Sequence, residues 1–519
     1  MASTFFGLTI AYSGLQAANT SLTITGHNVS NINTNGYTKQ QAGTQAADAL
    51  RTHTTYGAIG SGVVVTEISQ IRDSYYDVKY RNNMANYGQY SVKESYMGQI
   101  EDYLDEFTLN GYSQEYKNFF SAVNQLTITP GDTSAKNQLI NNAKSLADYF
   151  NTLTTNLRNV QADANNEIKD AVQQINSYAK NIAALNRQIN QIEANYGNAN
   201  DLRDKRNAMI DELSEIVTLE TSEADMGNTV SNFSVRINGQ TLVSSYSYNT
   251  LETVARTDKK NYSDAEGLYD VQWNSGQKFD MYSTSLSGHL KGLIDIRDGN
   301  NGEHENIETD DDGNNVTDSD GNLVLTTAPA ADKTVSFKGV PYYQAQLNEF
   351  ARIFSDAVNK IMKSGYTSDG SSKGISLFVT QPNTTVMSAG NITVNPELLK
   401  NADLLAIKKG QNDGESDARI MEELNKLQSE KIFAGGTGSY FLESIVSDMS
   451  IDSQKAVNLY KNYTDLKTSI HNQRLSIMGV DTDEEAMDMI KYQQAYNLNS
   501  KMMSVMNQIY DKLINQTGI

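Results

Sequence analysis

The chain has no cysteine among its 519 residues. A disulfide framework, a thiolate metal site and a cysteine nucleophile are therefore excluded. It also has no apolar run near the roughly 18 residues that a membrane helix needs. The N-terminus lacks the basic segment of a cleavable signal peptide, because the first lysine or arginine is Lys39. We therefore expect a chain that is either cytoplasmic or exported without losing a peptide.

Positive charge is in short supply. The chain has 42 Lys and Arg against 62 Asp and Glu, a formal net charge of −20, and no basic run. Because phosphate binding needs clustered cations, nucleic acid and anionic membranes are excluded as partners. The length predicts several domains, and a hydrophobic fraction of 38% predicts modest cores.

The first 38 residues contain no Asp, Glu, Lys or Arg. Their apolar positions follow the three-and-four spacing of a helix that pairs with other helices. These positions are Leu8, Ala11, Leu15, Ala18, Leu22, Thr25, Val29 and Ile32. The pattern alone also fits an ordinary amphipathic helix, but such a helix carries charge on its solvent face. An uncharged polar face favours a homopolymer, in which every charge would meet copies of itself.

The C-terminus has a similar pattern. Thr482-Asp-Glu-Glu485 predicts a capping box with Glu485 at the third helical position, and the helix should run to about Ile514. Its apolar positions are Ala495, Leu498, Met502, Val505 and Ile509, widened by Met506 and Leu513. Lys501 is the only charged residue between Tyr492 and Tyr510. We expect the two terminal helices to pack against each other. On assembly, the stripe of Leu498, Met502, Val505 and Ile509 should be buried against Leu8, Leu15 and Leu22 and against neighbouring copies of the chain.

The middle of the chain divides by pattern into helical and β-rich parts. A helical seam from Ile168 to Ile192 predicts a long antiparallel hairpin or bundle, whereas Phe233-Ser-Val-Arg-Ile237 before Asn238-Gly239 predicts a β-hairpin. We therefore predict an elongated, mainly α protein with a β-rich inserted domain and terminal helices that form a coiled-coil-like tubular part. The predicted divisions are an N-terminal axial helix and loop (1–45), a helical body in two parts (46–217 and 341–475), a β-rich outer insert (218–340) and a C-terminal axial helix (476–519).

Candidate chemistry is weak throughout. The densest acidic stretch is 303–321, but placing Glu308, Asp310 and Asp312 as calcium-loop ligands puts Ser319 where the bidentate Glu belongs. A solvated loop with Asp-Gly turns explains this stretch better. After His304-Glu305, the position of a second zinc-binding histidine is Glu308. We therefore predict no catalytic residue, no cofactor and no metal site, and keep a metal-dependent enzyme sited in 218–340 as an alternative from another functional class.

The two ends resemble bacterial flagellar axial proteins. Gly7-Leu8, Ser13-Gly14-Leu15 and the run from Asn28 to Gly36-Tyr37 resemble the N-terminal signature of rod, hook and hook-associated proteins. Asn35 stands where members of the family usually have proline. The C-terminal runs Gly479–Glu485 and Tyr492-Gln-Gln-Ala-Tyr496 resemble the terminal helix of the same superfamily.

Two internal segments narrow the resemblance to the family of hook-associated protein 1. They are Ser287–Asp298 and Asn391–Leu398, and rod and hook proteins are not expected to carry them. Another axial protein (hook, rod or flagellin) remains the alternative within the superfamily.

The resemblance implies a non-enzymatic structural subunit of the hook–filament junction. It implies export through the flagellar type III apparatus without a cleaved signal, and a final location outside the cell in the flagellum. The implied partners are copies of the chain in a ring, the hook protein, the second junction protein and an export chaperone. The expected assembly interface is Leu8, Leu15, Leu22, Val29, Ile32, Ala495, Leu498, Met502, Val505, Ile509 and Leu513. The expected chaperone-binding residues are Leu498, Met502, Val505 and Ile509.

Overall fold

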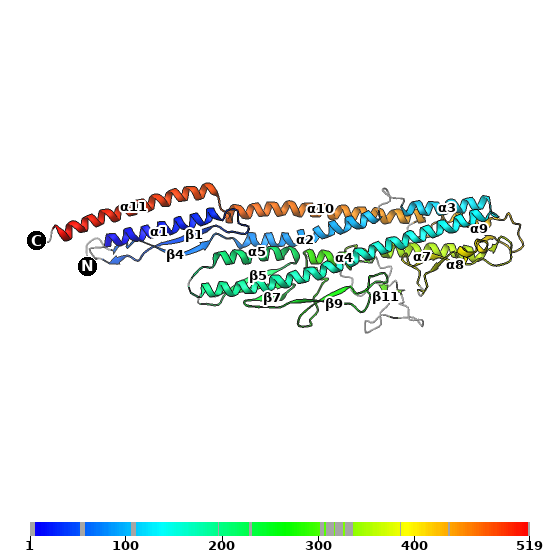
Figure 1. Cartoon of the computed structure of the whole chain (residues 1–519), viewed down its shortest axis with the longest axis horizontal. Coiled ribbons are helices and arrows are strands. Elements are labelled where there is room, and N and C mark those ends of the chain that lie inside the picture. The colour runs from blue at the N-terminus through cyan, green and yellow to red at the C-terminus, as the bar shows by residue number, and fades with distance from the viewer. Residues whose placement is uncertain are drawn as a thin grey trace. The chain divides into compact units, whose positions relative to one another are not determined.

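The computed structural model describes residues 6–516 except 52–57, 105–110, 196, 228–230, 302–305, 308–315, 317–324, 327–335, 383, 385 and 434–435. The described chain is mainly helical with small antiparallel sheets, which confirms the predicted fold class (Figure 1). Most of the acidic stretch 303–321, including the calcium-loop candidates Glu308, Asp310 and Asp312, lies outside the described residues.

The helices are α1 (Phe6–Ser30), α2 (Ser74–Leu104), α3 (Tyr112–Ile128), α4 (Thr133–Glu193), α5 (Asn200–Ile216), α6 (His289–Arg297), α7 (Val340–Ser364), α8 (Pro396–Lys400), α9 (Arg419–Lys426), α10 (Gly438–Met478) and α11 (Thr482–Asn515), with a 3-10 turn at Ala402–Leu404. The strands are β1 (Gln40–Ala46), β2 (Leu50–Arg51), β3 (Ala58–Ile59), β4 (Val63–Gln70), β5 (Glu220–Asp225), β6 (Ser231–Ile237), β7 (Gln240–Ser244), β8 (Ser247–Tyr248), β9 (Leu251–Ala255), β10 (Tyr269–Trp273), β11 (Asn306–Ile307), β12 (Leu325–Thr326), β13 (Tyr366–Thr367), β14 (Phe378–Thr380), β15 (Ile392–Val394) and β16 (Ala406–Lys408).

The chain forms two compact units. The first comprises 1–85, 175–250 and 464–519, and the second comprises 86–174 and 251–463. The predicted insert 218–340 therefore contributes to both, with β5–β8 in the first unit and β9 and β10 in the second. The five predicted divisions of the chain remain a prediction.

The first unit joins both chain ends to a sheet-covered helical hairpin. β1 pairs antiparallel with β4, and both strands contact α1. The β5-β6-β7-β8 sheet contains the predicted hairpin, with Asn238 and Gly239 at φ 51° and 76°, as a two-residue turn of this type requires. The sheet is fastened to α4 by Asn186, which donates to the Ser245 carbonyl at 2.9 Å, and to α5 by Arg206, whose guanidinium lies 3.8 Å from the centre of the Phe233 ring. These strands thus share a core with the helices.

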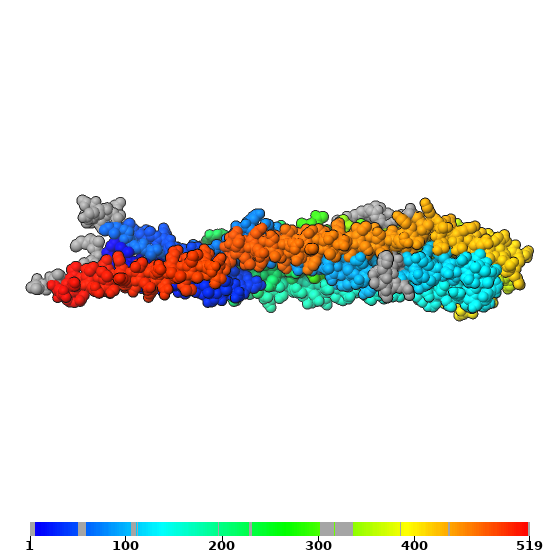
Figure 2. Space-filling model, turned by 90° about the horizontal axis from the view of Figure 1, so that it is seen from above, coloured from blue at the N-terminus to red at the C-terminus, as the bar shows by residue number. Residues whose placement is uncertain are grey.

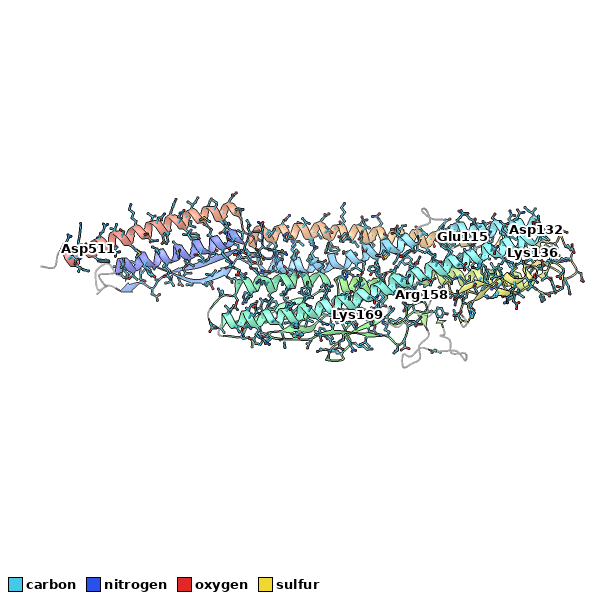
Figure 3. The ribbon with its side chains drawn as sticks, viewed as in Figure 1. Glu115, Asp132, Lys136, Arg158, Lys169 and Asp511 are labelled. Carbon is cyan, nitrogen blue, oxygen red and sulfur yellow. The ribbon has the colours of Figure 1, made fainter. Side chains whose placement is uncertain are left out.

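The second unit is centred on stacked aromatic rings. The Phe350 ring on α7 contacts Tyr116 of α3, Phe150 of α4 and Phe441 of α10. Its ring centre lies 5.3 Å from that of Phe150 and 5.5 Å from that of Phe354, which is also on α7. Lys136 and Arg158 lie along α4 (Figure 3). Lys136 Nζ lies 2.8 Å from Asp403 Oδ1, and Arg158 Nε donates to the Ser263 carbonyl at 3.1 Å. The 3-10 turn that contains Asp403 and the loop that contains Ser263 are therefore both bonded to α4.

The 287–298 segment, one of the two internal family motifs, is a structural element of the second unit. It forms α6, whose Leu290, Leu293 and Ile294 are fully buried. Beyond the helix, Asp298 lies 2.7 Å from Arg256 and also pairs with Arg297. Burial alone would raise the pKa of Asp298, but these two guanidinium groups hold it well below its usual range. The motif therefore supplies core packing and a buried ion cluster.

Candidate assembly interface

The start of α11 is capped one residue earlier than the sequence pattern predicts. The helix cap is Asp481, whose Oδ1 accepts from the backbone N–H of Asp483 at 2.8 Å and of Glu484 at 3.3 Å. The predicted capping box at Thr482 is therefore wrong, because Asp481 has the extended backbone that a cap needs. Glu485 is instead the single buried residue among those described in α11, and this burial gives it a different role.

The N-terminal and C-terminal signatures meet at Asn28, which is 1% exposed. Its amide nitrogen donates to the Gln40 carbonyl at 3.0 Å and to Glu485 Oε1 at 3.2 Å. Its amide oxygen accepts from the Tyr37 hydroxyl at 2.8 Å and from the Gln40 backbone N–H at 3.0 Å. One asparagine on α1 thus fixes the loop that follows α1 and the first turn of α11. We call Asn28, Tyr37, Lys39, Glu484 and Glu485 the terminal clamp.

Lys39 supplies the charge of the terminal clamp. Its Nζ lies 2.6 Å from Glu484 Oε2 and 3.1 Å from Glu485 Oε1, and its backbone N–H donates to the Met478 carbonyl at 2.9 Å. Burial alone would lower the pKa of Lys39, but the hydrogen bonds to both glutamates outweigh it and raise the pKa. Burial and nearby carboxylates, Asp201 first among them, raise the pKa of the Tyr37 hydroxyl as well. The clamp therefore favours a protonated lysine and a neutral tyrosine.

The raised pKa values of Lys39 and Tyr37 predict a contribution to the free energy of unfolding that is lost only at alkaline pH. A pKa raised on folding stabilises the folded state fully below the unfolded pKa, near 10 for both groups, and is lost as pH rises through the folded value. We expect the Lys39→Met variant, which keeps the side chain's length, to melt below the wild type at pH 7. The two melting temperatures should converge well above pH 10. A gap that persists or widens in alkali would contradict the role of Lys39.

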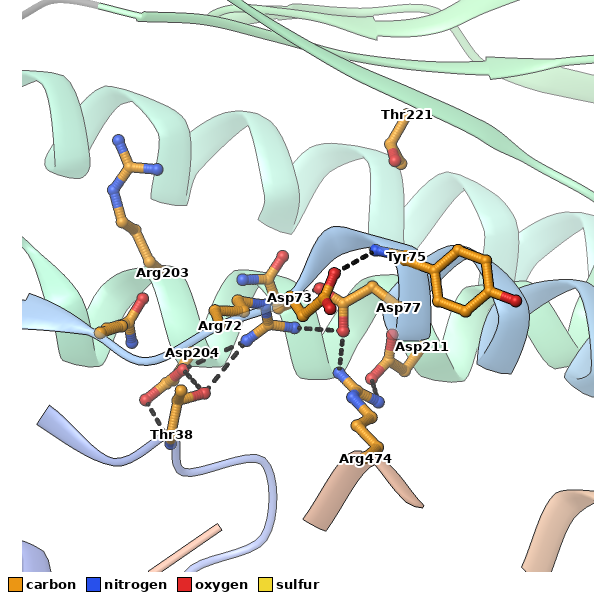
Figure 4. Close-up of polar contacts among 12 residues, drawn as sticks. Thr38, Arg72, Asp73, Tyr75, Asp77, Arg203, Asp204, Asp211, Thr221 and Arg474 are labelled. Carbon is orange, nitrogen blue, oxygen red and sulfur yellow. Dashed lines mark hydrogen bonds and ion pairs between the residues drawn. The ribbon is translucent and has the colours of Figure 1, made fainter. Parts of the chain in front are cut away.

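A second polar cluster joins α2, α5 and α10 next to the clamp (Figure 4). The Asp77 carboxylate forms ion pairs with Arg72 at 2.7 Å and with Arg474 at 2.8 Å. Arg474 also forms an ion pair with Asp211 at 2.6 Å. Asp204 accepts from the Thr38 backbone N–H at 3.0 Å and from its hydroxyl at 2.8 Å. Burial alone would lower the pKa of Arg474, but Asp211 and Asp77 raise it. This arginine cluster holds the loop of the N-terminal signature on the helical part of the first unit.

Helices α1 and α11 lie side by side (Figures 1 and 2). Their contact is close at two glycines of α1. A β-carbon on Gly7 would lie 2.7 Å from Met506 Cε, and one on Gly14 would lie 2.7 Å from Asn499 Oδ1. Only a glycine admits these side chains without a shift of the neighbour. The packed face of α11 therefore includes Asn499 and Met506, seven residues apart, as in a coiled coil.

An exposed apolar stripe on α11 lies beside this contact. Its members are spaced by three, four or eight residues and are 46–69% exposed; they are Met487, Ile490, Leu498, Met502, Val505, Ile509 and Leu513. Gln494 is the one polar residue at the stripe's spacing. Monomers rarely expose a continuous apolar surface of this kind unless it binds a partner. We call these seven residues the α11 stripe.

Helix α1 also presents an exposed face at helical spacing, and it is polar but uncharged. Its members are Thr9, Tyr12, Gln16, Asn19, Thr23, His27 and Ser30. The buried face of α1 consists of Ala11, Ala17, Ala18, Ser21, Ile24, Thr25 and Asn28. A helix that is uncharged all round is suited to packing against further helices.

The predicted interface residues divide into two groups. Leu8, Leu15, Leu22, Val29 and Ala495 are half-buried, whereas Ile32, Leu498, Met502, Val505, Ile509 and Leu513 are exposed. Helices α1 and α11 do pair as predicted, and Leu498 and Met502 are exposed in the single chain. Their burial against Leu8, Leu15, Leu22 and neighbouring copies on assembly stays a prediction. The β4 strand packs against one part of α1, where the Val63 N–H donates to Ser13 Oγ at 3.2 Å. The α11 face with Asn499 and Met506 packs against another part.

Sequence reasoning missed Lys39, Arg72 and Arg474. A usable signal existed for Lys39, which is the first charged residue and directly follows the N-terminal signature. Arg474 carried none, because its partners Asp77 and Asp211 are distant in sequence. Arg72 lies only five residues before its partner Asp77, but it matched no motif. Among the described residues, no three His, Asp or Glu side chains are grouped to hold a metal, and no helix has the length and hydropathy to span a membrane.

The fold and the terminal clamp define a structural protein whose two chain ends form one packed helix pair. Residues 97–378, more than half of the chain, match the family model described as flagellar hook-associated protein FlgK helical domain. Residues 471–516 match the model described as flagellar basal body rod FlgEFG protein C-terminal. The chain therefore belongs to the FlgK family of flagellar hook-associated proteins, which is a family of structural, non-enzymatic flagellar proteins.

Relatives align with the chain from end to end. Flagellar hook-associated protein 1 of Bacillus subtilis is 26% identical over 100% of this chain and 99% of its own length. The protein of the same name in Salmonella typhimurium is 28% identical over 97% of this chain and 98% of its own length. The structure of the flagellar hook junction protein FlgK from Burkholderia pseudomallei has a TM-score of 0.60 at 14% identity and covers 77% of this chain and all of its own, which establishes a shared fold.

Proposed function

We propose that this chain is a structural subunit of the bacterial flagellum at the junction between hook and filament, where it assembles through its terminal helices. The observation that carries this proposal is the end-to-end correspondence with proteins named flagellar hook-associated protein 1. Family membership implies assembly with other axial flagellar proteins. The finer partners that we propose are copies of the chain in a ring, the hook protein on one side and the second junction protein on the other.

The terminal helices support a mechanical role. The terminal clamp sets α11 against α1, and the α11 stripe then presents apolar side chains at a fixed orientation. A stripe on one copy that meets a different face on the next makes a heterologous contact, which generates rings or helical arrays instead of closed pairs. The uncharged polar face of α1 fits the same role, because it brings no like charges together between identical neighbours.

A second proposed role for the α11 stripe precedes assembly. Leu498, Met502, Val505 and Ile509 are exposed in the single chain, and an uncovered apolar stripe invites aggregation. We propose that an export chaperone covers these four residues with a helical groove, in the way that amphipathic helices are commonly recognised. Export without a cleaved signal and a final location outside the cell complete the proposal.

A deletion strain tests the function directly. A cell that lacks this chain should build hooks but no attached filaments, and supplying the chain in trans should restore the filaments. Loss of the hook as well would favour a rod or hook protein, and retention of filaments would exclude a junction subunit. Electron micrographs of the cell surface distinguish these outcomes.

A further inference from the structure

An asparagine–glycine pair lies in the exposed turn between α1 and β1. Asn35 and Gly36 are both exposed, and Gly36 has a φ of +78°. The neighbouring Thr34 and Tyr37 donate their backbone N–H groups within the turn, to the carbonyls of Asn31 and Thr34. Among the described residues, the Gly36 N–H has no hydrogen-bond acceptor and the Asn35 side chain has no polar partner. This pair is thus accessible to water, and one hydrogen bond, from the Tyr37 N–H to the Thr34 carbonyl at 3.2 Å, closes the turn around it.

We propose that Asn35-Gly36 is a site of spontaneous deamidation whose co-reactant is water. The Gly36 backbone nitrogen attacks Asn35 Cγ, a C–N bond forms, and the side-chain nitrogen leaves as ammonia after taking up the proton of the Gly36 amide. Water then opens the resulting succinimide ring at one of its two carbonyl carbons. One opening leaves aspartate at position 35, and the other leaves isoaspartate. Glycine permits the attack because it has no side chain to block its own nitrogen.

The chain carries its own comparator at Asn238-Gly239. That pair forms the two-residue turn of the β6–β7 hairpin, where Ile237 pairs with Gln240 and Asn238 is fixed at a φ of +51°. A ladder on both sides resists the rotation about Asn238 that the attack requires. The two pairs have the same chemistry and differ in restraint, so Asn35 should react faster than Asn238.

Deamidation at position 35 would act on the terminal clamp. Isoaspartate adds one carbon to the main chain two residues before Tyr37, whose hydroxyl bonds Asn28, and three before Thr38, which bonds Asp204. The new carboxylate would also join the carboxylates of Asp201, Asp204 and Glu485 that surround Tyr37. Both effects weaken the terminal clamp, so the contact between α1 and α11 should become less stable as the protein is stored. The consequence for assembly rests on the proposed function, whereas the reaction itself does not.

The reaction is tested on the purified full-length chain, kept for days at mildly alkaline pH and mapped by peptide mass spectrometry with enzymatic methylation of isoaspartate. We expect the Asn35 peptide to convert to aspartate and isoaspartate several times faster than the Asn238 peptide. Conversion of Asn238 at an equal or higher rate would overturn the proposal. The Asn35→Gln variant is the matched control, because its longer side chain closes the ring far more slowly.

The effect on the clamp is read by limited proteolysis of the aged samples. Aged wild type should be cut near the start of α11 faster than aged Asn35→Gln, and fresh samples of the two should be cut alike. Asn35→Asp separates the added charge from the added backbone carbon. Equal protection of the aged pair, with isoaspartate present, would refute the link to the clamp. None of these measurements uses flagella, so a failure of the proposed junction function would not change their outcome.

Discussion

The Met502→Asp variant is expected to fold normally and to fail in assembly. Met502 is 50% exposed on the α11 stripe, so the substitution removes little packing from the single chain. Surface changes of this kind usually alter the free energy of unfolding by no more than about 0.5 kcal/mol. In an apolar interface, however, an unpaired carboxylate costs on the order of several kcal/mol. We expect an unchanged melting temperature, a loss of motility and the loss of chaperone binding by calorimetry.

Ser504→Asp is the matched control for this variant. Ser504 is also exposed on α11 and lies two residues along the helix, on neither the stripe nor the face that contacts α1. It introduces the same charge at the same depth in the helix and should leave assembly and chaperone binding nearly intact. A Met502→Asp protein that swims and binds its chaperone would remove the stripe from both interfaces. A lower melting temperature would show that Met502 contributes to the fold of the single chain.

The Asp77→Ala variant is expected to unfold the first unit readily. Asp77 is 6% exposed and is paired with both Arg72 and Arg474. Removing one partner from a buried ion cluster typically costs about 3–5 kcal/mol, because the remaining charges stay desolvated. We expect a correspondingly large loss in the free energy of unfolding by denaturant titration, and with it a loss of assembly.

Asp73→Ala serves as the control for that variant. Asp73 lies one turn earlier and caps α2 by accepting from the Tyr75 backbone N–H at 2.9 Å, without an arginine partner in the cluster. Its loss should cost about 1 kcal/mol, as cap removals do. If both variants lose the same small amount, the arginine cluster is a surface network with little weight in the fold.

Much of the terminal architecture could be predicted from the sequence. The uncharged segment before Lys39 and the three-and-four spacing in both terminal segments correctly indicate two long helices that pair. The Asn238-Gly239 hairpin was equally predictable, because its backbone requires residues that tolerate positive φ. Local chemistry determines features of this kind, and they therefore appear in the pattern.

The choice of contacting faces could not be predicted. Helix α11 carries two adjacent faces at heptad spacing, one with Asn499 and Met506 and one with Leu498 and Met502. The second is more apolar, and hydrophobic patterning alone therefore selects it. In the structure, close approach at Gly7 and Gly14 favours the first face and leaves the more apolar one exposed. An apolar seam that does not pack within its own chain is the feature that points to a partner.

The role of the α11 stripe in assembly is tested most directly by its solvent access before and after assembly. Because the chain has no cysteine, one substitution supplies a unique thiol. Met502→Cys should react rapidly with a maleimide in the purified chain and slowly in flagella that carry the variant, while Tyr246→Cys, on an exposed loop of the first unit, should report any general loss of access. Protection of Met502→Cys alone in the assembled flagellum is the result expected. Equal labelling of Met502→Cys in the free chain and in the flagellum would contradict an assembly interface at this stripe.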